Sequence, residues 1–89
     1  MKQGKLYDST KSIGKNCIIN SGVVIGSKHD NSQIATIGDS VELCVGAKVI
    51  GDISVGSNVL VAPNAVVIKH VPSNCIVGGI HAKILKSKE

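Results

Sequence analysis

The chain has 89 residues, a net charge of +4 and a single aromatic residue, Tyr7, while hydrophobic residues make up 43% of it. A globular core of this size normally uses several aromatics to fill its volume, so the composition argues against such a core and favours a thin one. The scarcity of stacking aromatics argues against nucleic-acid binding, and the lack of a signal peptide or a membrane-length apolar run predicts a cytoplasmic protein with no membrane partner.

Residues 1–12 are expected to form an irregular segment or a partial first coil, and a six-residue apolar period begins at Ile13. With one double step, the period comprises Ile13, Ile19, Ile25, Ile37, Leu43, Val49, Val55, Val61 and Val67. A short fixed period of this kind is typical of a solenoid. It matches neither the helical period nor the alternation of a long amphipathic strand, so we expect no helix in the repeat.

Each six-residue unit also contains its own turn. A second apolar set follows each residue of the period by four positions, namely Cys17, Val23, Val41, Ala47, Ile53, Val59, Ala65 and Val71. Three positions after the period stand only Gly, Asn, Asp or Ser, namely Asn16, Gly22, Ser40, Gly46, Asp52, Asn58 and Asn64. These types tolerate left-handed or tight-turn backbone, so each unit predicts a short strand followed by a corner.

Three such corners close a triangle, so about eighteen residues make one coil, and coils stack at roughly the 4.8 Å spacing of parallel strands. Overlaying the sequence in steps of three units gives three uniform columns: Ile13, Ile37 and Val55; Ile19, Leu43 and Val61; Ile25, Val49 and Val67. The residues therefore predict an all-β, three-sided solenoid of about four coils over residues 13–84.

Residues 27–36 interrupt the period and are expected to form a loop extruded from one corner. The segment is largely polar and supplies six more residues than one coil needs. A narrow apolar core cannot bury such a segment without leaving donors and acceptors unpaired. His29 stands in this loop beside Asp30, which is able to orient an imidazole. His29 is our candidate catalytic base, with a solvated loop histidine as the alternative.

A narrow prism buries little of its own surface, so we expect the chain to assemble with copies of itself through one face. Apolar residues beside the period are candidates for that face, namely Ile18, Val24, Leu60, Val66 and Ile68. Residues 85–89 continue a lysine-rich stretch and are expected to form a solvated basic tail. His70 is expected to be exposed at a corner.

Cysteine and histidine spacings give no sign of a metal site or a disulfide. The three cysteines, Cys17, Cys44 and Cys75, are odd in number and irregularly spaced. Cys17 falls on an inward column and is expected to be a core residue. No two histidines have the short spacing of paired ligands, so we expect no metal.

Four motifs carry a resemblance to a known family: Thr36 to Val41, Val45 to Gly51, Val61 to Val67, and the closing Gly78 to Ile84. With them the chain resembles the bacterial hexapeptide-repeat acyltransferases, above all serine acetyltransferases and the O-acetyltransferases of surface polysaccharides. The resemblance implies a left-handed parallel β-helix assembled as a homotrimer. His81 stands where the closing motif of the family usually has Pro, and a packing or surface role is expected for it.

The resemblance also implies a co-substrate, acetyl-coenzyme A, which lies in a groove between two subunits and is contacted mainly by backbone groups. About four coils give a groove of roughly 19 Å, long enough for an extended pantetheine arm. The positions that match these contacts are Gly46, Ala47, Ala62, Pro63, Gly78, Gly79 and Lys83. Lys83 is expected to neutralise a phosphate. A turn or core role in the repeat is the alternative for each.

In this family a histidine takes the proton of the acceptor hydroxyl as it attacks the thioester, and a backbone N–H stabilises the oxyanion. Counting back from Ile13, that histidine falls on Met1, and the Arg-His-Pro of serine acetyltransferases corresponds to residues 33–35, which read Gln-Ile-Ala. We therefore carry two hypotheses. One is an acetyl-coenzyme A-dependent O-acetyltransferase acting on a hydroxyl of serine or a sugar. The other is a truncated trimeric β-helix without the N-terminal region, which still binds coenzyme A and catalyses nothing.

Overall fold

The fold is taken from a computed structural model, which describes residues 6–7, 12–26 and 35–88. Within these ranges the chain forms strands and turns and no helix, as the six-residue period predicts. The strands are β1 (Leu6–Tyr7), β2 (Ser12–Ile13), β3 (Ile18–Ile19), β4 (Val24–Gly26), β5 (Thr36–Ile37), β6 (Glu42–Leu43), β7 (Lys48–Ile50), β8 (Ser54–Val55), β9 (Val59–Val61), β10 (Val66–Val67), β11 (Cys75–Gly78) and β12 (Lys83–Ser87). The described part of the chain has no helix able to cross a membrane.

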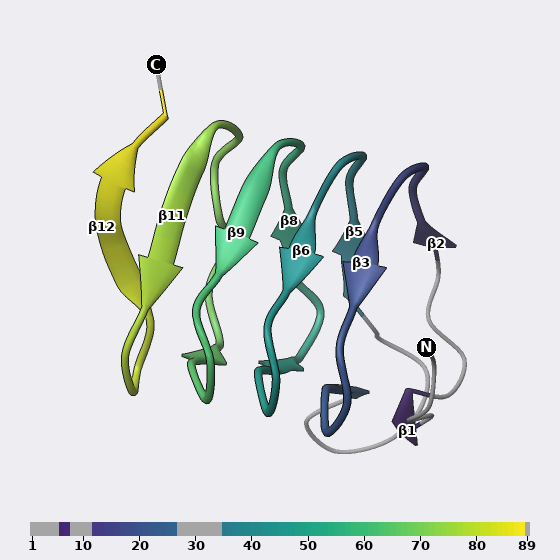
Figure 1. The fold of residues 1–89 in the computed structure, drawn as a ribbon. Helices are drawn as coiled ribbons and strands as arrows, with labels where there is room; N and C mark the ends of the chain where they lie inside the picture. The colour runs from purple at the N-terminus through teal and green to yellow at the C-terminus, as the bar shows by residue number, and fades with distance from the viewer. Residues whose placement is uncertain (1–5, 8–11, 27–34, 89) are drawn as a thin grey trace.

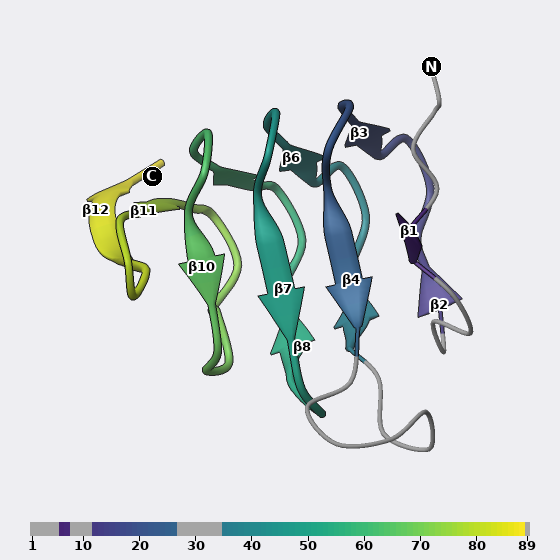
Figure 2. The same cartoon turned by 90° about the horizontal axis from the view of Figure 1, so that it is seen from below.

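The strands form three sheets, one on each side of a prism. Sheet A has the order β1-β4-β7-β10, sheet B the order β2-β5-β8, and sheet C the order β12-β11-β9-β6-β3. The chain visits sheets B, C and A in turn, and one such circuit is one coil (Figures 1 and 2). In Figure 1 it rises along β2, β5 and β8 at the back and descends along β3, β6 and β9 at the front while advancing from right to left. This winding makes the fold a left-handed parallel β-helix.

The strand pairing confirms the three columns predicted from the period. Ile13 pairs with Ile37, which pairs with Val55, in sheet B. Sheet C aligns Ile19, Leu43 and Val61, and sheet A aligns Ile25, Val49 and Val67. From the second coil on, these residues and the second apolar set fill the prism, and the buried residues among those described include no polar or charged side chain.

The corners follow the predicted residue types, with one exception. Left-handed backbone occurs at the predicted corners Asn16, Gly22, Ser40, Gly46, Asn58 and Asn64. At the remaining corner the left-handed residue is Gly51 (φ 105°), and not Asp52. Gly51 donates its N–H to the carbonyl of Gly26 in the preceding coil. The position that needs left-handed backbone at this corner is therefore Gly51, one residue before the predicted one. Asp52, the next residue, is exposed.

The end of the predicted loop and the C-terminal tail differ from expectation. Ala35 is fully buried and Thr36 begins β5, so the coil resumes two residues before the end of the predicted loop. Most of the loop, including His29, lies outside the described residues. The expected basic tail instead continues β12, which pairs antiparallel with β11. The chain reverses after Gly79 (φ 99°), so β12 covers the edge of sheet C that the last coil would otherwise leave open.

Candidate functional site

Small residues of successive coils lie at the corner between sheets C and A. This small-residue corner comprises Gly46 and Ala47 in the second coil, Ala62 and Pro63 in the third, and Gly78 and Gly79 in the fourth. Backbone hydrogen bonds hold the third and fourth coils together, because the N–H of Ala62 donates to Val77 O at 2.9 Å and that of Val66 donates to Gly79 O at 3.1 Å. The structure thus brings six of the seven positions expected to contact the cofactor to one corner.

The space at this corner is tight. A Cβ on Gly78 would lie 2.9 Å from Leu85 Cδ1 and 3.1 Å from Ala62 Cβ, and a Cβ on Gly46 would overlap the Asn64 side chain. Gly46 also has left-handed backbone, with φ 75°. The left-handed backbone therefore favours glycine at Gly46, whether or not a ligand lies against it. At Gly78 the nearest atom belongs to the exposed side chain of Leu85, which is able to move aside.

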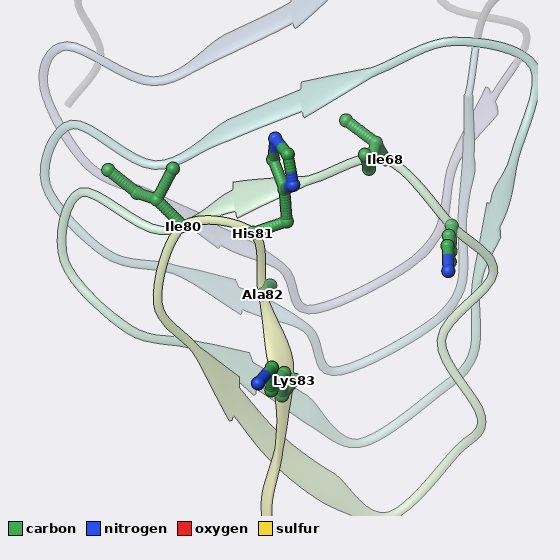
Figure 3. A pocket seen from close by; sticks show the side chains of 6 residues that line it. Ile68, Ile80, His81, Ala82 and Lys83 are labelled. Carbon is green, nitrogen blue, oxygen red and sulfur yellow. The ribbon is translucent and has the colours of Figure 1, made fainter.

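Two adjoining cavities flank the other side of sheet A, and they share Ile68 and Lys69. One, of about 410 Å³, lies where the second and third coils turn from sheet A to sheet B and is lined by Ile50, Gly51, Asp52, Ile53, Ile68 and Lys69. The other, also of about 410 Å³, lies between the end of β10 and the turn into β12 and is lined by Ile68, Lys69, Ile80, His81, Ala82 and Lys83 (Figure 3). Together their linings combine the apolar side chains of Ile50, Ile53, Ile68 and Ile80 with Asp52, His81 and the ammonium groups of Lys69 and Lys83.

Lys83, the seventh expected contact, pairs with Gly78 of the small-residue corner across β11 and β12, and it also lines the second cavity. Sequence reasoning missed Lys69 because nothing in the period marks it. The only available signal was its position two residues after Val67, where the chain leaves sheet A. Ile68, which was expected in an oligomer face, lines both cavities.

The two described histidines have different surroundings. His70 is exposed at a corner, as expected, and its Nδ1 accepts the backbone N–H of Ser54 at 2.9 Å. The Ser54 Oγ lies 3.3 Å from the same nitrogen. His81 is exposed and lines the second cavity. His29, the candidate base, lies outside the described residues.

The thiols are positioned as small apolar residues. Burial raises the pKa of Cys44, and the nearby Glu42 carboxylate raises it further. Burial also raises the pKa of Cys75, and the Lys88 ammonium offsets part of that rise. All three cysteines are free, and Cys17, packed against the core as expected, directs its Sγ to Gly38 O at 3.2 Å. Within the described ranges, no three His, Cys, Asp or Glu side chains gather as metal ligands do.

The sequence was compared with known proteins, and no family profile matches it. The serine acetyltransferase of Staphylococcus aureus is 40% identical over 85 residues, which cover 93% of this chain and 40% of that protein. The serine acetyltransferase of Synechococcus elongatus is 34% identical over 84 residues, covering 92% and 34%. The chain therefore spans between a third and two fifths of the length of these relatives.

Solved structures show the same fold. Serine acetyltransferase from Brucella abortus in complex with coenzyme A has a TM-score of 0.79 and 34% identity, over 83% of this chain and 30% of that one. The Neisseria gonorrhoeae enzyme has a TM-score of 0.80 and 30% identity, over 88% and 32%. A galactoside acetyltransferase in complex with coenzyme A has a TM-score of 0.78 at 20% identity, which shows a shared fold alone.

The stacked six-residue units, the left-handed prism and these matches define the class: the chain belongs to the hexapeptide-repeat acetyltransferases. The resemblance inferred from the sequence motifs is confirmed. Within that class, the matched proteins described above at 30% identity or more are serine acetyltransferases, and the match is to the β-helix they contain.

Proposed function

We propose that this chain is the cofactor-binding β-helix of an acetyl-coenzyme A-dependent O-acetyltransferase that acts on a hydroxyl of serine or a sugar. The observation that carries the proposal is the joint agreement of sequence and fold, at 34% identity and a TM-score of 0.79, with a serine acetyltransferase solved with coenzyme A. We further propose that the chain works as a homotrimer, with the cofactor in a groove between two copies.

The surroundings of sheet A suit this cofactor. At the small-residue corner, Pro63 and Gly79 are exposed, so the backbone at these two positions is open to close approach by a ligand. Across the sheet, Ile50 and Ile68 provide an apolar wall for a pantetheine arm. Lys69 and Lys83 provide ammonium groups for phosphates, which bind charged donors more strongly than neutral ones.

Acetyl transfer itself needs a base for the acceptor hydroxyl. As the base removes the proton, the oxygen attacks the thioester carbon, and the acetyl group passes from sulfur to oxygen with release of the thiol. The described residues of the two cavities are binding groups for this reaction. His29 remains our proposed base, because it follows Gly26 by three residues in the sequence and Gly26 pairs with Ile50, which lines the first cavity.

Calorimetric titration with coenzyme A tests the binding site. We expect Lys69→Gln and Lys83→Gln each to weaken binding about tenfold, as the loss of about 1.4 kcal/mol from a charged contact predicts. Lys15→Gln is the matched control, because Lys15 is exposed at the corner between sheets B and C, away from both cavities. Equal affinities for all three variants, or no binding by the wild type, would refute the site.

A thioester-cleavage assay with serine and with common sugars tests the activity. We expect turnover with at least one acceptor and its loss in His29→Ala. His70→Ala is the control, because that imidazole is bound to Ser54 on the outer face of sheet B. Turnover that survives His29→Ala would show that another group is the base.

A second function is favoured by one observation. Where serine acetyltransferases have Arg-His-Pro, residues 33–35 read Gln-Ile-Ala, and Ala35 is fully buried in the core. A chain with this substitution could bind coenzyme A as a trimer without transferring acetyl groups. Tight coenzyme A binding together with no turnover on any acceptor would identify this second function.

A further inference from the structure

Two of the three outer faces of the prism are apolar, and the third is polar. On sheet C the paired outward residues of successive coils form the C stripe: Ile18, Glu42, Leu60 and Ile76. On sheet A they form the A stripe: Val24, Lys48, Val66 and Ile80. On sheet B the corresponding described residues are Thr36 and Ser54. Ile18 and Ile80 are 54% and 75% exposed, so the stripes present real apolar surface to a partner.

Each stripe carries one charge, and the two charges have opposite signs. Glu42 pairs with Ile18 on one side and Leu60 on the other. Lys48 is flanked in the same way by Val24 and Val66. Because β6 and β7 are consecutive strands of the second coil, the two charges also lie at the same height along the prism (Figures 1 and 2).

We propose that the C stripe packs against the A stripe of a neighbouring copy with equal coils at equal height, and that Glu42 pairs there with Lys48 of the partner subunit. In this arrangement the apolar stripe residues of the first, third and fourth coils contact apolar stripe residues of the partner. In the second coil the negative charge of one copy contacts the positive charge of the other. Any shift by one coil would set a charge against an aliphatic side chain, which costs free energy because that charge is desolvated without a partner. The charge pair therefore fixes the height at which the copies associate.

The local geometry prepares Lys48 for this role. Its Nζ donates to Gly46 O at 2.8 Å, which holds the ammonium toward the small-residue corner between the two stripes. An ammonium has three donors, so it can keep this bond and also bind a carboxylate. Glu42 is half-buried on its own face, so a partner that covers it would desolvate it further.

The stripes also select the symmetry. If two copies met through the same stripe about a two-fold axis parallel to the prism, Glu42 would face its own copy, or Lys48 would, and like charges would repel. Pairing of unlike faces is heterologous, so it builds a ring where the rotation between copies closes and a filament where it does not. The inference rests on the self-association proposed above and assigns its contacting faces.

Charge reversal tests the pairing, with the mass of the assembly measured by light scattering over a range of concentrations. We expect Glu42→Lys and Lys48→Glu each to weaken association about tenfold or more, and the doubly reversed chain to recover most of that loss. Thr36→Lys is the matched control, because Thr36 is the first residue of β5 in the same coil but lies on sheet B. It should associate like the wild type.

Three outcomes would overturn the inference: a monomeric wild type, single reversals that associate normally, or single reversals whose defect the double reversal does not repair. Circular dichroism checks that each variant is folded. If a reversed chain does not fold, the neutral variants Glu42→Gln and Lys48→Gln decide, because unchanged association in both would equally overturn it. Coenzyme A titration of the same variants reports on the cofactor site, so failure here is distinguishable from failure of the proposed function.

Discussion

At the corner between sheets B and C, a glycine in each of three coils makes room for an oxygen of the next coil. The backbone N–H that follows Gly14 donates to Asp39 Oδ1 at 2.9 Å, and the one that follows Gly38 donates to Ser57 Oγ at 3.0 Å. The N–H after Gly56 donates to Ser73 Oγ in the same way, at 2.9 Å. Each oxygen lies where a Cβ on the glycine would stand. The hydrogen bond and the missing Cβ are thus two parts of one arrangement.

Gly38→Ala should therefore destabilise the fold. The added Cβ would lie 2.7 Å from Ser57 Oγ and 2.8 Å from the carbonyl carbon of Gly56, and that backbone cannot move aside. Overpacking of this kind costs about 1–3 kcal/mol of unfolding free energy, measured by urea denaturation. Gly26→Ala is the control, because its Cβ would meet nothing nearer than Val24 Cγ1 at 4.0 Å. Equal stability of the two variants would show that the stacked coils move apart enough to accommodate the added methyl group at little cost.

Two substitutions of Asn58 distinguish the contribution of backbone conformation to stability from that of the side-chain hydrogen bond. It has left-handed backbone, with φ 56°, and its Nδ2 donates to Asn74 Oδ1 at 2.8 Å. Asn58→Gly removes the side-chain bond but keeps the turn, whereas Asn58→Ala loses both. We expect Asn58→Ala to be less stable than Asn58→Gly by about 1 kcal/mol in thermal or chemical unfolding, the cost of left-handed backbone for a residue with a Cβ. The reverse order would mean that this corner is not under conformational constraint.

Cys75 should make the fold sensitive to alkaline pH. Folding raises the pKa of its thiol from the ordinary value of 9.0 because the group is buried. Above that pH the unfolded chain loses the proton while the folded chain keeps it, so the unfolded state binds fewer protons and stability falls as pH rises. Cys75→Ala should show a smaller loss of stability between pH 8 and pH 10, in roughly that window. Parallel stability curves for the two proteins would contradict this.

Among the elements, β12 differs from every other strand. It runs antiparallel, all its residues are exposed, and it forms the outer edge of sheet C. Its end is tied to the corner by Lys88, whose N–H donates to Asn74 O at 2.8 Å and whose Nζ donates to Asn58 Oδ1 at 3.2 Å. The strand thus closes one edge of the prism with little burial of its own.

Hydrogen exchange should resolve this difference. Amides of β12 should exchange well before those of β9, which lies between β6 and β11 and whose Val59 and Val61 are fully buried. Local opening needs less free energy where few apolar contacts are broken. Mass spectrometry of peptides covering each strand measures the two rates. Simultaneous exchange would mean that β12 opens only with the whole fold.

The period was sufficient to predict the strands because every unit repeats the same inward residues and the same corner type. It failed where the chain stops repeating. Residues 83–87 carry no six-residue signal, and their strand depends on the free edge of β11, a feature of the assembled sheet. The corner at Gly51 was assigned one residue late because Gly and Asp are adjacent there and both suit a turn.

The candidate site likewise has a part that follows from the repeat and a part that does not. Part of the small-residue corner was predictable, because Ala62 and Pro63 follow Val61 as Gly78 and Gly79 follow Val77, and the structure aligns Val61 with Val77. Gly46 and Ala47 lie two positions farther along the same turn. The second cavity was not predictable, because it arises where Lys69 and the turn at residues 80–83 meet at the end of the prism. Positions within a coil follow from the period, whereas contacts between the last coil and the returning chain do not.

At the scale of the whole molecule, the outward stripes predict that stability depends on protein concentration. A folded chain that binds copies of itself is stabilised by mass action, so the midpoint of thermal unfolding should rise by a few degrees for about a tenfold increase in concentration. Leu60→Lys places a second charge on the C stripe and should abolish the rise, whereas Thr36→Lys on sheet B should preserve it. Scanning calorimetry or fluorescence at two concentrations measures the shift. A midpoint that is the same at both concentrations in the wild type would mean that the apolar stripes remain exposed to solvent in the native state.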